Sequence, residues 1–301
     1  MSGGAINDGA LATFAEEVGA DGPVACVGGR TQWSVGGAVE AGTREVRAPA
    51  GIAEYEPAEM VVRCGAGTTV ADLDAALGEK SQCVALPAWD GATVGGVLAV
   101  GRSGIRRLGY GPVRDTLLEA RYVSAEGRLV KAGGPTVKNV SGFDLCRLLV
   151  GSLGTLGLLG EVVLRCRPRP AVSRWMTGEA EPFDLFHRLT QPSSILWDGS
   201  TTWVLLEGHP ADVDDQARLM GFSDVEGPPP LPTGGRVSMR PSQLRTLEGT
   251  FVAEIGVGVV HTSGPAPAAP VTPGVAELNR RIKQSFDPTG RLNPGRRVAA
   301  A

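Results

Sequence analysis

The alternation of apolar and polar residues predicts a protein that mixes helices and strands. An amphipathic helix is expected over residues 7–19, because Leu11, Phe14 and Val18 recur at helical spacing ahead of Gly19. Other apolar runs in the first half are bounded by glycine and proline, as strands and short helices are. They predict strands at 23–29, 60–64, 84–87, 116–123, 128–131 and 161–167, and a helix at 68–79.

The pattern changes after Pro170. One clear strand is expected at 201–208, a helix after Pro210, and a second apolar strand at 251–260. Two proline-rich connectors, at 227–235 and 264–274, lack an apolar pattern and are expected to be exposed loops. A polar helix within 276–297 precedes the stretch DPTGRLNPGR. We therefore expect an α+β chain in three parts, 1–170, 171–275 and 276–301, with the last part returning to the first.

Composition and charge exclude several classes of protein. A net charge of −3 over 301 residues argues against a nucleic-acid-binding face. The amino terminus lacks the features of a signal peptide, and no apolar run approaches the ~18 residues of a membrane span. A cytoplasmic location is expected, and association with the inner membrane face through partners stays open.

The residues that usually bind metals are scattered. The five cysteines contain no C-x-x-C pair, so they predict neither an iron–sulfur cluster nor a zinc site, and reduced, buried thiols are expected. The three histidines lie far apart in sequence and are expected on the surface or in loops of the second part. No P-loop and no G-x-S-x-G motif is present.

A strand–GAG–helix pattern at 61–77 imitates the start of a Rossmann dinucleotide site. The position of its third glycine is Val70, however, and no βαβ unit follows. A tight turn, with Thr68 or Thr69 capping the next helix, is the preferred interpretation.

Three glycine-rich stretches, at 27–37, 86–107 and 138–164, favour a flat or phosphorylated ligand lying close to the backbone. In order, they resemble the FAD-binding domain of the vanillyl-alcohol oxidase and p-cresol methylhydroxylase (PCMH) type of flavoprotein. Within that family they are similar to the FAD-binding subunit of bacterial glycolate oxidase. The segments GATVGGVLAVGRSGIRRLGYGPVRD, VKNVSGFDLCRLLVGSLGTLGLLGEV and DPTGRLNPGR carry the resemblance.

The resemblance implies a fold and a cofactor. The fold is a PCMH-type, two-subdomain FAD-binding domain over 1–170, with a smaller, shortened α+β cap over 171–275. The cofactor is FAD, and because Arg30 stands where family members with covalent flavin often have histidine, the flavin is expected to be non-covalent. The implied cofactor-binding residues are Gly28, Gly29, Arg30, Thr31, Gln32, Pro87, Ala92, Thr93, Val94, Gly95, Gly96, Ser103, Gly104, Gly151, Ser152, Leu153, Gly154, Thr155, Val162 and Asn293.

The family also implies a reaction, the oxidation of a small 2-hydroxyacid by hydride transfer from its α-carbon to flavin N5. This needs a cation for the carboxylate and a base for the hydroxyl. Arg106, Arg107 and Lys138 are candidates for the cation, although each also fits a solvated charge or a phosphate partner. The matched segments contain no histidine to act as the base.

Two hypotheses follow. In the first, the chain is itself a flavoenzyme. In the second, it is an accessory subunit that binds FAD, or only scaffolds, in a complex with a second FAD-binding oxidase subunit and an iron–sulfur subunit. A cell-wall reductase with the same FAD fold fits less well, because the D-P-x-G-x-x-N-P-G tail resembles the oxidase branch.

Overall fold

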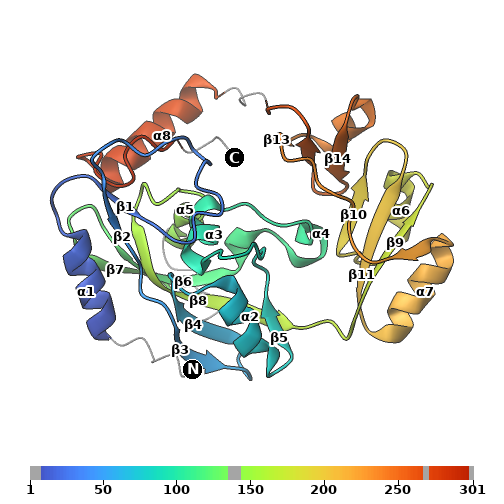
Figure 1. Cartoon of the computed structure of the whole chain (residues 1–301), viewed down its shortest axis with the longest axis horizontal. Coiled ribbons are helices and arrows are strands. Elements are labelled where there is room, and N and C mark those ends of the chain that lie inside the picture. Colours follow the sequence, from blue (N-terminus) through green and yellow to red (C-terminus); the bar gives the residue numbers. More distant parts are fainter. Residues whose placement is uncertain (1–7, 135–143, 267–270, 298–301) are drawn as a thin grey trace. The chain divides into compact units, whose positions relative to one another are not determined.

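The computed structural model describes residues 8–134, 144–266 and 271–297 (Figure 1). These residues form two units. The first contains the described residues up to Ser103, those of Pro112–Arg169, and the carboxy-terminal segment from 271 on. The second contains Gly104–Gly111 and the residues from Pro170 to 266. Gly104–Gly111 thus belongs to the second unit, although it lies inside the range 1–170 expected for the first part.

The first unit is built on an antiparallel sheet with the strand order β3-β4-β8-β6-β7, and β5 also pairs with β8. The strands are β3 (Ile52–Glu56), β4 (Val61–Gly65), β5 (Gln82–Val84), β6 (Leu117–Val123), β7 (Leu129–Gly133) and β8 (Leu158–Pro168). A separate parallel pair joins β1 (Val24–Cys26) to β2 (Arg44–Val46). The helices are α1 (Asp8–Val18), α2 (Val70–Gly78), α3 (Val94–Val100), α5 (Leu145–Leu149) and α8 (Pro273–Phe286), with a 3₁₀ turn η1 (Val113–Asp115).

One face of this sheet forms the main core. Val62 and Cys64 of β4 and Val162 of β8 are buried there with Leu73 of α2 and Leu98 of α3. Because side chains alternate along a strand, Arg63 lies on the opposite face. Among the strands expected from the sequence, 84–87 is displaced: the structure places β5 at Gln82–Val84, which pairs with Cys166–Pro168 of β8.

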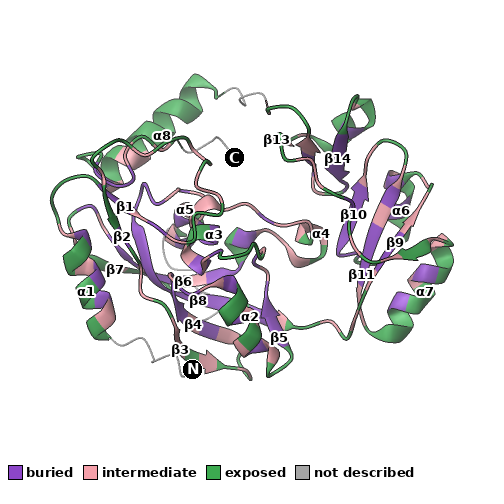
Figure 2. Cartoon of the chain, viewed as in Figure 1, coloured by how far each residue is buried: buried purple, intermediate pink, exposed green. Residues whose placement is uncertain are grey.

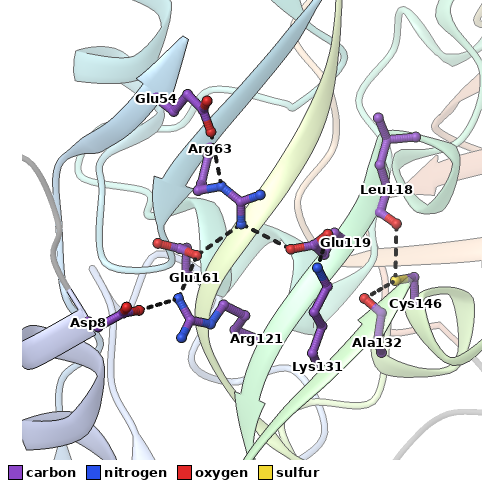
Figure 3. Close-up of polar contacts among 10 residues, drawn as sticks. All are labelled: Asp8, Glu54, Arg63, Leu118, Glu119, Arg121, Lys131, Ala132, Cys146 and Glu161. Atoms are coloured by element: carbon purple, nitrogen blue, oxygen red, sulfur yellow. Dashed lines mark hydrogen bonds and ion pairs between the residues drawn. The ribbon is translucent and has the colours of Figure 1, made fainter. Parts of the chain in front are cut away.

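The opposite face carries a buried network of charges (Figure 3). Arg63 donates to Glu119 at 3.0 Å and to Glu161 at 3.1 Å, and the side chains of these glutamates are 1% and 3% exposed. Lys131 pairs with Glu119 at 3.0 Å, and Arg121 lies 3.5 Å from Glu161. The network joins β4, β6, β7 and β8, so it ties four strands of one sheet together.

A β-bridge and several hydrogen bonds hold the carboxy-terminal segment against the amino-terminal part of the first unit. Leu292 forms a parallel bridge with Val24. The buried guanidinium of Arg291 donates to backbone carbonyls of Val18, Asp21, Gly22 and Ala125. Asp287 accepts from the amides of Arg291 and Leu292. These bonds determine where the residues after Leu292 lie.

The second unit is a seven-stranded antiparallel sheet in the order β12-β9-β11-β10-β14-β15-β13. Its strands are β9 (Val172–Gly178), β10 (Ser194–Trp197), β11 (Thr202–Gly208), β12 (Ser223–Val225), β13 (Gly235–Ser238), β14 (Phe251–Glu254) and β15 (Val259–Thr262). Its helices are α4 (Arg107–Tyr110), α6 (Pro182–Arg188) and α7 (Pro210–Met220), with a 3₁₀ turn η2 (Pro241–Thr246). In the parts of the chain that are described, no helix is long and apolar enough to cross a membrane.

Three expectations for the second unit are corrected. The apolar run at 251–260 is a hairpin, because Gly256 and Gly258 take φ values of 78° and 80° between β14 and β15. The connector at 227–235 is not wholly exposed, since Pro229 is buried and Leu231 packs on an apolar cluster of the sheet. His261 is neither a surface nor a loop residue: it lies on β15, and its Nε2 is 2.9 Å from buried Glu254.

Candidate functional site

A deep pocket lies within the first unit, beside the glycine-rich stretches. Segments 26–35, 66–67, 89–100 and 149–159 line it, together with residues of the carboxy-terminal segment. The empty space, counted together with the open mouth, is about 950 Å³.

The loop after β1 brings bare backbone to the pocket. In the described structure, no hydrogen bond involves the amides of residues 28–32, all of which line the pocket. A Cβ on Gly28 would lie 2.2 Å from Oγ1 of Thr93, and one on Gly29 would lie 1.7 Å from the Gly91 carbonyl oxygen. Only glycine allows this approach of the two loops. Successive unbonded amides of this kind form a concave site for an anion.

Two arginines and a tryptophan flank this loop. The guanidinium carbons of Arg30 and Arg296 lie 5.0 Å and 4.3 Å from the ring centroid of Trp33. Arg30 also pairs with Glu45 at 2.6 Å, whereas Arg296 donates to backbone carbonyls, among them that of Val35 at 2.8 Å. Burial lowers the pKa of Arg296 from its ordinary value, but an arginine keeps its proton at neutral pH. The wall therefore carries a cation with no carboxylate partner in the described residues.

Helix α3 also lines the pocket and lies close to the turn at 66–67. A Cβ on Gly95 would come within 2.7 Å of the Ala66 Cβ, so glycine sets the distance between helix and turn. Thr93 caps the helix by accepting from the Gly96 amide at 3.2 Å. The GAG turn does end in a cap on α2: Thr69 Oγ1 accepts from the Asp72 amide, as the preferred interpretation required.

The loop of residues 151–155 contacts the carboxy-terminal segment at Asn293. Its Nδ2 donates to the Leu153 carbonyl at 2.7 Å, and its amide donates to Val24 at 2.8 Å. A Cβ on Gly154 would lie 2.3 Å from that Nδ2, so glycine is required there too. The side-chain carbonyl oxygens of Asn293 and of Gln32 are buried without a hydrogen-bond partner, and both residues line the pocket. Such oxygens are satisfied only when a ligand or water donates to them.

These features fit FAD. Unbonded amides and a cation suit its diphosphate, and the two unpartnered oxygens suit N–H or O–H donors of its ring and ribitol. The pocket offers little acid–base chemistry of its own: its described lining contains no histidine, lysine, aspartate or glutamate. Burial raises the pKa of the lining thiol of Cys26 to about 11, so that thiol is neutral at physiological pH.

The structure brings most of the expected cofactor residues to the pocket. Those lining it are Gly28, Gly29, Arg30, Thr31, Gln32, Thr93, Gly95, Gly96, Ser152, Leu153, Gly154 and Asn293. The others do not line it: Pro87, Ala92, Val94, Ser103, Gly104, Gly151, Thr155 and Val162. Val94 and Val162 belong to the core, Ser103 accepts from the Val113 amide, and Gly104 lies in the second unit.

The candidate substrate cations do not line the pocket. Arg106 is exposed and pairs with Glu207 at 3.1 Å inside the second unit, and Arg107 lies in α4 of that unit. Lys138 lies outside the described residues.

Several lining residues were missed in the sequence. They include Cys26, Trp33, Ala66, Gly67, Trp89, Gly157 and Arg296. Arg296 is the last residue of DPTGRLNPGR, so a sequence signal for it was present in a motif that carries the resemblance. Ala66 and Gly67 belong to the GAG turn, which was interpreted as only structural. Trp33 and Trp89 lie inside the glycine-rich stretches 27–37 and 86–107, but no signal distinguishes them from their neighbours there.

Comparisons with known proteins agree with this site. Residues 7–133 match the FAD binding domain family. The chain is 29% identical to the glycolate oxidase subunit GlcE of Escherichia coli, over 92% of this chain and 93% of that protein. It is 40% identical to D-lactate dehydrogenase of Archaeoglobus fulgidus, over 43% of this chain but 29% of that protein. A solved structure of alkyldihydroxyacetonephosphate synthase superposes on 94% of this chain and 73% of its own, with a TM-score of 0.67 and 14% identity.

Residues 7–133 therefore match an FAD-binding domain, and the first unit has the PCMH-type FAD-binding fold. Along nearly its whole length the chain is similar to the glycolate oxidase subunit GlcE of Escherichia coli.

Proposed function

We propose that this chain is the FAD-binding subunit of a 2-hydroxyacid oxidoreductase complex of the glycolate oxidase type. The observation that carries the proposal is the pocket in which the unbonded amides of residues 28–32 stand beside the unpartnered oxygens of Gln32 and Asn293. The similarity to GlcE extends over both units and not only over the FAD domain, which favours a protein of the same type.

The chain's own residues would hold the cofactor without a covalent bond. The amides of 28–32 bind the diphosphate, and Arg296 offsets its charge. Asn293, fixed by its bonds to Leu153 and Val24, accepts a hydrogen bond from the ligand through Oδ1. Arg30, which has a φ of 57° and pairs with Glu45, offers no nucleophile for attachment to flavin. When bound, FAD supplies a two-electron acceptor for the hydride removed from the hydroxyacid α-carbon.

The absorbance spectrum of the purified chain tests the proposal first. We expect a yellow protein whose flavin leaves on heating, because Arg30 offers no nucleophile and burial raises the pKa of Cys26, the thiol in the described lining, to about 11, which keeps it neutral. A folded, colourless chain that cannot be reloaded with FAD would refute flavin binding. Anaerobic bleaching by glycolate or D-lactate would then place turnover in this chain, since those compounds are the substrates named for its relatives.

A second candidate is an accessory subunit that binds FAD while a partner performs the oxidation. It is favoured by the described pocket lining, which contains no histidine, lysine or carboxylate to take the hydroxyl proton. The partners would be a second FAD-binding oxidase subunit and an iron–sulfur subunit. No group of three or more potential metal ligands exists among the described residues, so clusters would have to come from elsewhere. An FAD-loaded chain that is inert alone but is reduced by hydroxyacid within the purified complex would favour this candidate.

A further inference from the structure

A tryptophan lies at the open rim of the pocket. Trp89 lines the pocket, yet it is 39% exposed. It belongs to residues 88–91, the exposed tip of the connection between β5 and α3 (Figure 2). In the described structure, its indole makes no hydrogen bond and no contact with another aromatic ring or a cation. A single exposed tryptophan on a surface needs no explanation, but one that lines a cofactor pocket offers a flat apolar face to the ligand.

The backbone holds Trp89 close to the loop that would bind the diphosphate. Trp89 is the first residue of a tight turn, in which its carbonyl accepts from the Ala92 amide at 2.9 Å and Gly91 takes a φ of 72°. The carbonyl of the same Gly91 lies so close to Gly29 that a Cβ there would be 1.7 Å from its oxygen. The Cα atoms of Trp89 and Gly91 are at most about 7 Å apart. The indole therefore lies within reach of a group attached to the diphosphate.

Small residues next to the turn leave room for a flat ring. Ala66 and Gly67 line the pocket, and their segment is bonded to the start of α3, where the Gly95 amide donates to the Ala66 carbonyl at 2.7 Å. Ala48 also lines the pocket, and its carbonyl oxygen is 2.3 Å from where a Cβ on Gly67 would lie. None of these three residues has a side chain larger than a methyl group. A ring at this end of the pocket meets no bulky side chain from them.

FAD carries two flat rings, one at each end of its diphosphate, and the lining distinguishes between them. The isoalloxazine has an N–H group that needs an acceptor when it is enclosed, and the oxygens of Gln32 and Asn293 are buried without a partner. Adenine at the rim needs only a stacking surface, because water there can satisfy its polar edge. We propose that Trp89 stacks on the adenine ring of FAD. This rests on the flavin-binding part of the proposed function.

This contact would make Trp89 a determinant of the choice of FAD over FMN. FMN has the same isoalloxazine and ribitol and one phosphate, but it has no adenosine. Replacing an aromatic side chain that stacks on a base by alanine weakens binding roughly 5- to 150-fold. Because Trp89 is partly exposed, a value toward the lower end, about tenfold, is expected for FAD. Binding of FMN should not depend on the indole.

Equilibrium titrations of the whole chain, freed of flavin and still folded by far-UV circular dichroism, provide the test. Trp89→Ala should raise the Kd of FAD and of ADP about tenfold and leave that of FMN within about twofold. Trp89→Phe, which keeps an aromatic face, should bind FAD within about threefold of the wild type. Leu129→Ala is the matched control, because Leu129 is similarly exposed, at 37%, but does not line the pocket. It should leave all three dissociation constants unchanged.

A spectrum gives a second readout that needs only FAD. The visible absorbance of bound FAD should be the same in Trp89→Ala and in the wild type, because the indole does not touch the isoalloxazine. If Trp89→Ala fails to fold, Trp89→Leu, which keeps apolar bulk without an aromatic face, replaces it, and a loss of about threefold is expected for FAD and ADP.

Three results would overturn the assignment. Equal weakening of FAD and FMN, or a changed visible spectrum, would put the indole on the isoalloxazine, and an unchanged Kd of FAD would show that it stacks on neither ring. The proposed function fails separately. A wild-type chain that binds no FAD would refute the flavin site itself, whereas a chain that needs Trp89 for FAD but is inert to hydroxyacids, alone and in its complex, would refute only the hydroxyacid reaction.

Discussion

Removing Arg63 from the buried network should destabilise the first unit more than removing any surface charge. In Arg63→Met, the carboxylates of Glu119 and Glu161, at 1% and 3% exposure, each lose a partner about 3 Å away. Breaking a buried pair costs roughly 3–5 kcal/mol, because it leaves a charge without compensation. Arg63 is itself 24% exposed, and each glutamate keeps a second cation, Lys131 or Arg121. We therefore expect a loss of about 2–3 kcal/mol.

The cost of leaving the two carboxylates unpaired can be separated from the loss of packing by also removing the charges of Glu119 and Glu161. Arg63→Met combined with Glu119→Gln and Glu161→Gln should recover at least half of the loss, because amides cost less to bury than carboxylates. Stability is measured by urea unfolding, with release of bound flavin reporting the first unit and an unchanged m-value as the check on two-state behaviour. Arg169→Met, which breaks an exposed pair with Asp74, is the control and should cost less than about 1 kcal/mol. A triple variant as unstable as Arg63→Met alone would refute the reasoning.

Three further predictions concern the pocket and the core. Gly29→Ala should abolish flavin binding, because its Cβ would meet the Gly91 carbonyl at 1.7 Å, while Gly274→Ala, in open space, should leave the flavin content unchanged. Asn293→Asp should weaken FAD binding at least about tenfold in an equilibrium titration, since it removes the donor to Leu153 and adds a buried charge. An unchanged Kd would contradict that role. Burial raises the pKa of the Cys64 thiol from 9.0 to about 12. The unfolded chain therefore loses this proton first, and its contribution to stability, complete below pH 9, is lost as the pH rises toward 12. Urea unfolding under reductant at pH 8 and pH 10.5 should show the decline, which Cys64→Ala should reduce.

Much of the first unit could be predicted, because its signals are local. The helix α1, the hairpin of β6 and β7, and the cap at Thr69 follow from spacing and turn chemistry over a few residues. The glycine loops could be predicted because close approach of backbone segments requires glycine, and repeated glycines are visible in the sequence. Residues such as Gly29 and Gly154 are constrained by atoms far along the chain, yet the constraint shows at the position itself.

The features that were missed depend on contacts between distant segments. Trp33 lies in the glycine-rich stretch 27–37, but its contact with Arg296, 263 residues away, leaves no signal near it in the sequence. The hairpin at 251–262 looked like one strand because both arms are apolar and its turn glycines also fit a strand bulge. Val94 and Val162 were carried over as cofactor residues because they lie inside matching motifs. Their side chains are buried in the core and do not line the pocket, and whether their backbone contacts the cofactor stays a prediction.

The contact between the carboxy-terminal segment and residues 18–24 also determines when during synthesis the protein can bind its cofactor. The pocket uses residues from Cys26 to Arg296, and Leu292, next to Asn293, forms a parallel bridge with Val24. During synthesis, the first 160 residues can emerge and collapse while the residues that complete the pocket are still unmade. FAD should therefore load only after residues 293–296 have emerged from the ribosome. A ribosome that stalls before the DPTGRLNPGR segment would yield a polypeptide that has every glycine loop but cannot retain flavin.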